Sequence, residues 1–211
     1  MNFRKIILLA ALALGAFALY LLFYPVHYKN FPPTASGDWI AFGDSLTVGY
    51  GASPGNDYPT LLSQRLGIPI QNLGVAGDTT GAAWSRIDAA LQLRPRVVLL
   101  CLGGNDGLQQ ISASEMISNL SRIIDAFQQA GSFVVVIGVH SASLLRDTNA
   151  SRFEKLAKEK QAFYVPDILD GVLGSPSLMS DQVHPNDEGY KAIAERLEKI
   201  LRPLLPKLKN S

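Results

Sequence analysis

The chain has 211 residues, of which 47% are hydrophobic and 18% charged, and it carries a formal net charge of +1 at pH 7. Such a composition excludes an intrinsically disordered chain, and the nearly balanced charge excludes an electrostatic affinity for nucleic acid. Beyond an apolar N-terminal stretch, about 175 residues remain, which is enough for one domain with its own core.

The N-terminal stretch has the character of a membrane segment. Arg4 and Lys5 precede an unbroken apolar run from Ile6 to Tyr24, which ends at Pro25. As a helix, this run would be about 28 Å long, close to the thickness of a bilayer core. The positive charges before it predict an anchor whose N-terminus lies in the cytoplasm and whose domain lies on the other side.

A cleaved signal peptide is the alternative interpretation of the same segment. Its apolar region would be Ile6–Gly15, and its small-residue cleavage site would be Ala16-Phe17-Ala18. Residues 1–24 are therefore a membrane anchor or a signal peptide, and both would export the domain. Residues 25–37 lack periodicity and indicate a linker, so the domain is expected over residues 38–211.

From Asp38 onward, patterns typical of strands and of helices alternate. Buried aliphatic strands that alternate with amphipathic helices predict an α/β fold, in which a mostly parallel sheet lies between two helix layers. We predict five strands, preceded in the whole chain by the N-terminal hydrophobic helix. The predicted strands are 39–42, 68–73, 96–102, 133–139 and 163–166, and the predicted helices are 58–66, 80–93, 112–130, 150–160 and 187–201.

Metal and disulfide chemistry have little support in the sequence. Cys101 is the single cysteine, and it lies in an apolar run that predicts a buried thiol. His27, His140 and His184 are far apart and show no ligand spacing. We therefore expect neither a metal nor a cofactor.

Ser45 follows the first predicted strand, within Gly43-Asp44-Ser45-Leu46. In parallel sheets, sites form beyond the carboxyl ends of the strands, so a serine at this place can be an exposed nucleophile. A serine hydroxyl needs a positioned base, and the base in turn needs an orienting group.

The segment from Asp181 to Asn186 offers both of these groups. An aspartate three residues before a histidine in a non-helical turn can reach the imidazole and set its tautomer. Pro185 keeps His184 out of helical geometry, and Asn186 is a good N-cap for the last helix. His140 ends the fourth strand and is a competing base, but it lacks such an aspartate.

Two further loops at the same sheet edge could supply hydrogen-bond donors. The loop from Asn72 to Thr80 contains Gly74 and Gly77, and glycines let backbone N–H groups approach a substrate closely. The loop Gly103-Gly104-Asn105-Asp106-Gly107 contains an asparagine whose side chain can donate. Such donors stabilise the oxyanion that forms during acyl transfer.

These four segments together resemble the motif blocks of the SGNH hydrolases, also called GDSL esterases/lipases. The resemblance covers about residues 38–201. Within that family the chain looks most similar to the bacterial thioesterase I/lysophospholipase/arylesterase group, notably over Leu102–Leu108.

The resemblance implies a flavodoxin-like fold and a catalytic triad of Ser45, His184 and Asp181. It implies an oxyanion hole formed by the Ser45 and Gly77 backbone N–H groups and the Asn105 side chain. It further implies a serine hydrolase without a cofactor. From the N-terminal segment, we expect this enzyme to be exported and either anchored on the periplasmic side of the inner membrane or, after cleavage, periplasmic or secreted; a retained anchor would depart from the usual family pattern of a cleaved signal.

The substrate class stays open at this point. Small acyl esters, thioesters or lysolipids are expected first, and O-acetyl groups of an envelope glycan are the alternative. A membrane-tethered binding module without activity is a different class of explanation. We expect a monomer, and the loop Ser141–Asn149 is expected to shape the pocket.

Overall fold

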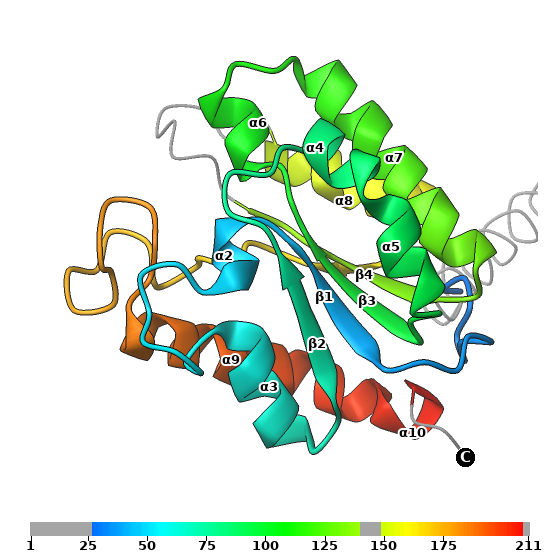
Figure 1. Cartoon of the computed structure of the whole chain (residues 1–211), viewed down its shortest axis with the longest axis horizontal. Coiled ribbons are helices and arrows are strands. Elements are labelled where there is room, and N and C mark those ends of the chain that lie inside the picture. Colours follow the sequence, from blue (N-terminus) through cyan, green and yellow to red (C-terminus); the bar gives the residue numbers. More distant parts are fainter. Residues whose placement is uncertain (1–26, 140–148, 209–211) are drawn as a thin grey trace, which may run out of the picture.

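The computed structural model describes residues 27–139 and 149–208, which form a sheet between two layers of helices (Figure 1). All pairs in the sheet are parallel, and the strand order is β2-β1-β3-β4-β5. The predicted three-layer α/β fold is therefore confirmed. The strands are β1 (Trp39–Gly43), β2 (Ile70–Gly74), β3 (Val97–Cys101), β4 (Phe133–Ile137) and β5 (Phe163–Val165).

The strand order places a crevice beside the end of β1. The chain passes from β1 to β2 on one side and then returns to β3 on the other side of β1. At such a switch point the following loops diverge to opposite faces, which leaves space beyond the carboxyl ends of the strands. Gly43, the last residue of β1, pairs with Gly74 of β2 and with Cys101 of β3. The loops after these three strands therefore start side by side.

Each face of the sheet packs against its own helix layer. Trp39 and Ala41 of β1 belong to one core cluster, whereas Ile40 and Phe42 belong to the other, because side chains alternate along a strand. The first layer contains α3 (Tyr58–Leu66), α9 (Asp187–Leu201), a 3₁₀ turn (Arg202–Leu204) and α10 (Leu205–Leu208). The second contains α4 (Thr80–Ser85), α5 (Ile87–Gln92), α7 (Ala113–Gln129) and α8 (Asn149–Glu159).

Local signals explain where the long helices begin. The side chains of Asp57, Ser112 and Asn186 each accept a backbone N–H in the first turn of α3, α7 and α9, respectively. These caps satisfy donors that would otherwise lack a partner. The sequence therefore predicted α3 and α9 with the observed bounds, and α7 within one residue at each end.

Four predictions about local structure were wrong. Two segments expected as loops contain short helices, α2 (Ser45–Val48) and α6 (Gly104–Leu108). The helix expected over residues 80–93 is divided into α4 and α5 at Arg86, whose backbone leaves helical geometry (φ −110°, ψ 13°). Strand β2 begins at Ile70 rather than residue 68, and it is the edge strand beside β1.

The described part of the predicted linker lies against the amino end of the sheet. Thr34 and Ala35 donate backbone hydrogen bonds to Gly131 O, and Gly37 bridges to Pro95 just before β3. The loops that follow β1, β2 and β3 lie at the opposite, carboxyl edge of the sheet (Figure 1). Within residues 27–139 and 149–208, no helix has the length and apolarity needed to cross a membrane. The predicted anchor or signal peptide lies outside the described residues.

Candidate active site

Ser45 is the first residue of the short helix α2, directly after β1. Asp44 caps this helix by accepting the Leu46 N–H at 3.0 Å. The helix lies tightly against the end of β2, since a Cβ at Gly74 would be 2.4 Å from Val48 N. Thr47 Oγ1 shares a buried hydrogen bond of 3.0 Å with the Tyr58 hydroxyl, which ties α2 to α3. Packing on two sides therefore holds the half-buried Ser45 in place.

The structure brings Ser45, His184 and Asp181 together although about 140 residues of chain separate the serine from the histidine. His184 Nε2 lies 3.0 Å from Ser45 Oγ, and His184 Nδ1 lies 2.8 Å from Asp181 Oδ2. Because an ionised carboxylate only accepts, Nδ1 carries the proton toward Asp181, and Nε2 can then accept from the serine.

The loop that carries His184 is itself well braced. Asp181 Oδ1 accepts the backbone N–H groups of Val183 and His184, both at 2.8 Å. Burial raises the pKa of Asp181, but these two bonds and the His184 ring outweigh it and lower the pKa below its ordinary value. Asn186 accepts from Gly189 N at the start of α9 and donates to Ser177 O. The aspartate is therefore held as an anion in one orientation.

Tyr50 was not predicted to take part, yet its ring lies on the imidazole of His184. The two ring centroids are 4.6 Å apart, and the planes are inclined by 49°. Tyr50 O accepts the hydroxyl of the buried Tyr190 at 2.9 Å. The next residue, Gly51, has φ +92°, and a Cβ there would be 2.7 Å from Pro185 O. The chain after α2 thus packs closely on the histidine loop.

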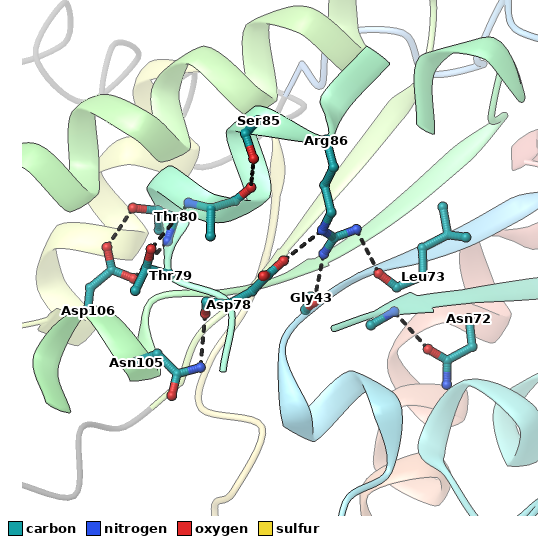
Figure 2. Close-up of polar contacts among 12 residues, drawn as sticks. Gly43, Asn72, Leu73, Asp78, Thr79, Thr80, Ser85, Arg86, Asn105 and Asp106 are labelled. Carbon is teal, nitrogen blue, oxygen red and sulfur yellow. Dashed lines mark hydrogen bonds and ion pairs between the residues drawn. The ribbon is translucent and has the colours of Figure 1, made fainter. Parts of the chain in front are cut away.

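Besides Ser45 itself, the predicted oxyanion donors lie in the helix α6 and in the loop between β2 and α4. Asn105 lies in α6, and its Nδ2 donates to Asp78 O at 2.9 Å (Figure 2). This bond uses one of the two amide N–H groups, so the other remains for a substrate. Gly77 is exposed, has φ +83°, and has no heavy atom within 4 Å of a Cβ placed on it. Asn105 and Ser45 both line one cavity, whereas Gly77 is not part of its lining.

That cavity is small and mainly apolar, with a volume of about 100 Å³. Its polar lining consists of Asp44, Ser45, Asn105 and His184, together with the backbone of Gly104. An aliphatic group fits such a surface better than a sugar does. The apolar lining residues are Leu46, Leu108, Val139, Leu169, Leu173 and Val183.

Asp44 is a buried carboxyl in the wall of this cavity, with 2% of its surface exposed. Burial raises its pKa to about 7, although the Leu46 N–H and His184 act in the opposite direction. In the sequence, Asp44 is only one member of the Gly43-Asp44-Ser45-Leu46 motif and has no predicted role of its own. Nothing in the local sequence could reveal that the surrounding core removes it from water.

The other predicted residues fall outside the site or outside the described residues. The Cys101 thiol is buried, as expected, and burial raises its pKa well above the ordinary value. His27 is exposed at the start of the described chain. His140 and the loop Ser141–Asn149 lie outside the residues whose side chains are described. Among the described residues, no group of three His, Cys, Asp or Glu side chains could hold a metal ion.

Comparisons with known proteins show the family to which the chain belongs. A model of the GDSL-like lipase/acylhydrolase family matches residues 41–192. An arylesterase of Vibrio mimicus is 32% identical over 172 residues, which cover 76% of this chain and 86% of the relative. The thioesterase 1/protease 1/lysophospholipase L1 of Escherichia coli K12 is 30% identical over 184 residues, which cover 83% and 88%.

A solved structure extends the likeness to three dimensions. The structure of AlinE4, an SGNH-hydrolase family esterase, is 33% identical and superimposes with a TM-score of 0.63 over 84% of this chain and all of its own. The chain therefore belongs to the GDSL-like lipase/acylhydrolase family.

Proposed function

We propose that the protein is a serine hydrolase of carboxylic esters or thioesters, with Ser45 as nucleophile, His184 as base and Asp181 as orienting group. The observation that carries this proposal is the line of hydrogen bonds from Ser45 Oγ to His184 Nε2 (3.0 Å) and from His184 Nδ1 to Asp181 Oδ2 (2.8 Å). A serine so arranged can lose its proton as it attacks, which a free serine cannot do at neutral pH. The names of the relatives, an arylesterase and a thioesterase, support the same reaction class.

The proposed reaction has two halves. Ser45 Oγ attacks the carbonyl carbon while His184 Nε2 takes the hydroxyl proton, and a tetrahedral oxyanion forms. His184 then returns this proton to the leaving alcohol or thiol, and the acyl group stays on Ser45. In the second half, water attacks the acyl carbon as His184 removes one of its protons. The carboxylic acid leaves when the proton passes back to Ser45 Oγ.

Three donors are proposed for the oxyanion: the backbone N–H groups of Ser45 and Gly77 and the free amide N–H of Asn105. The support is that α2 and α6 place Ser45 and Asn105 in the wall of one cavity. Donors held in advance stabilise the charge that develops on the carbonyl oxygen, and the loss of one typically lowers kcat by about 10²- to 10³-fold.

For the substrate, we favour esters and thioesters of short-to-medium aliphatic acids over acetylated glycans. The cavity beside Ser45 is lined by six aliphatic side chains, which bind an acyl chain through the hydrophobic effect. Each additional methylene that is buried should contribute about 0.8 kcal/mol until the cavity is full. kcat/KM should therefore rise with chain length from acetate and then level off or fall.

A series of p-nitrophenyl esters tests both the reaction and the preference. Wild type should hydrolyse the series, and a fluorophosphonate probe should label Ser45. Ser45→Ala should abolish both results, whereas Ser114→Ala, at an exposed serine in α7, should change neither. Ester hydrolysis by Ser45→Ala at the wild-type rate would refute the proposed nucleophile. A higher kcat/KM for an acetylated glycan than for every aliphatic ester would shift the assignment to glycan deacetylation.

We also propose that residues 1–24 export the domain, as an uncleaved anchor or as a signal peptide. The support is the apolar run from Ile6 to Tyr24 behind Arg4 and Lys5. Because Thr34 and Ala35 are bound at the amino edge of the sheet, an anchor would keep the catalytic edge turned away from the membrane. The intact mass of the purified protein, after separation of membrane and soluble fractions, distinguishes a full chain in the membrane from one that begins at Leu19. A full-length chain found only in the cytoplasm would contradict the proposal.

A further inference from the structure

Arg86 lies at the point where the sequence predicts an uninterrupted helix and the structure has two. It is both the last residue before α5 and the residue that closes α4, and its backbone is not helical. Its side chain makes no helix cap. Instead it extends toward Gly43 at the end of β1, Leu73 of β2 and Asp78 in the loop that follows β2 (Figure 2). The break between α4 and α5 therefore directs the Arg86 guanidinium toward the candidate site.

The guanidinium of Arg86 donates to two backbone carbonyls and to one carboxylate. Its Nη2 donates to Gly43 O at 3.0 Å, and its Nη1 donates to Leu73 O at 2.9 Å. Its Nε donates to Asp78 Oδ2 at 2.6 Å (Figure 2). The guanidinium carbon also lies 4.1 Å from the centre of the Phe42 ring. Only a planar group with several fixed donors satisfies all of these partners, so lysine is not an equivalent.

Asp78 connects Arg86 to Asn105, because it contacts both residues. Its carboxylate is held by Arg86, and its backbone oxygen accepts the Asn105 Nδ2–H at 2.9 Å. The same bond sets the plane of the Asn105 amide and leaves one N–H for the oxyanion. Asp78 also follows Gly77, the other proposed loop donor. The position of the loop from Leu73 to Asp78 thus depends on where the guanidinium holds Asp78.

A second set of hydrogen bonds, which does not involve Arg86, joins α6 to α4 and α7. The buried carboxylate of Asp106 accepts the Thr80 N–H at 2.9 Å and the Thr80 hydroxyl at 2.6 Å (Figure 2). Asn119 adds a bond of 3.3 Å to the same hydroxyl. These bonds join α6, α4 and α7 without Arg86. Loss of the guanidinium should therefore misplace the Asn105 amide without releasing the helix that carries it.

We propose that Arg86 is a positioning residue for the oxyanion donor Asn105 and that it acts through Asp78. This inference depends on the proposed serine hydrolase function. Without the guanidinium, Asp78, which is only 8% exposed, loses the group that holds its carboxylate together with Gly43 O and Leu73 O, and a lysine ammonium cannot donate to all three in this geometry. The loop must then rearrange to hydrate this charge, and the carbonyl that orients Asn105 moves with it. Transition-state binding should weaken, while binding of the uncharged ester should change little.

The first test is the kinetics of Arg86→Lys on a short p-nitrophenyl ester. We expect kcat to fall about 10- to 100-fold and KM to stay within about threefold of wild type. Guanidinium chloride, at concentrations too low to unfold the protein, should raise kcat of Arg86→Ala, whereas equal sodium chloride or urea should not. Arg122→Ala is the matched control, because its guanidinium also stacks on a ring, that of Trp84, but contacts no site residue named above.

The second test asks whether the effect passes through Asn105. Asn105→Ala alone should lower kcat by about 10²- to 10³-fold. In that background, Arg86→Lys should reduce kcat by no more than about threefold, because its target is already absent. If Arg86→Lys costs the same factor with and without Asn105, or raises KM at unchanged kcat, the proposal is overturned.

Two further measurements separate failure of the Arg86 proposal from misfolding of the variant and from failure of the serine hydrolase function. If Arg86→Lys does not fold, Asp78→Asn tests the same link from the other side, because it removes the carboxylate that Arg86 holds and leaves the Arg86 bonds to Gly43 O and Leu73 O in place. Wild-type kcat in a folded Asp78→Asn protein would also overturn the proposal. The serine hydrolase function itself is judged by Ser45 labelling and by Ser45→Ala, which do not depend on Arg86.

Discussion

Asp44 provides a direct test of how burial sets the pH dependence of stability. Its carboxyl is almost wholly enclosed between β1 and α2, and burial raises its pKa from 3.8 to about 7. Between these pH values the folded protein holds a proton on Asp44 that the unfolded chain releases. Asp44→Asn removes this titration but keeps a side chain that can cap α2 in the same way.

The sign and size follow from proton linkage. Because the folded state binds more protons at Asp44 than the unfolded state, its contribution makes the free energy of unfolding fall as pH rises from 3.8 to about 7. The cost of ionising the buried group above this range is about 4 kcal/mol at most. Asparagine carries no such cost, so the stability of Asp44→Asn should decline less between about pH 5 and pH 8, by about 2 to 3 kcal/mol.

Urea unfolding at these two pH values, followed by tryptophan fluorescence, measures the difference, since Trp39 is buried in the core. The full chain can be kept in a mild detergent because of its apolar N-terminal run. Asp88→Asn, at an exposed acid in α5, is the control and should follow the wild-type profile. If Asp44→Asn and wild type lose equal stability between the two pH values, the carboxyl is ionised in the folded protein and the reasoning fails.

Three other predictions concern catalysis, packing and accessibility. Asp181→Asn removes the anion that receives the imidazole N–H, so kcat on a p-nitrophenyl ester should fall about 10²- to 10⁴-fold at little changed KM; a loss below about threefold would exclude this role. Gly74→Ala places a Cβ 2.4 Å from Val48 N and should lower the free energy of unfolding by about 1 to 3 kcal/mol, whereas Gly81→Ala, with its nearest contact at 3.6 Å, should not destabilise. Cys101 should react with a thiol reagent such as DTNB only after unfolding, and rapid labelling of the native protein would disprove its burial.

Much of the fold could be predicted because its signals are local. The strands β3 and β4 are almost wholly aliphatic, and α3, α7 and α9 begin at capping side chains, so the element type follows from a short stretch of residues. The break at Arg86 could not be predicted in this way. Apolar residues continue at helical spacing across it, and the partners that favour the break come from Gly43, Leu73 and Asp78.

The residues of the candidate site also differ in whether local sequence could predict their roles. Ser45, Asp181, His184 and Asn105 were selected because their side chains have the required chemistry and stand at the ends of predicted strands or before a predicted helix. Tyr50 and Asp44 were not given a role, because the ring contact with His184 and the loss of water around the carboxyl arise only after distant segments pack.

The sequence by itself therefore determined the order of the elements, the kind of chemistry and the residues able to perform it, because these depend on side-chain type and on neighbours along the chain. Tertiary structure decided the distances and the environments. It placed His184 Nε2 3.0 Å from Ser45 Oγ, enclosed Asp44, and turned the Arg86 guanidinium onto Asp78. Each of these depends on atoms that are far apart in sequence, and only the packing of α2, α6 and the loop before α9 around the ends of the strands brings them within contact.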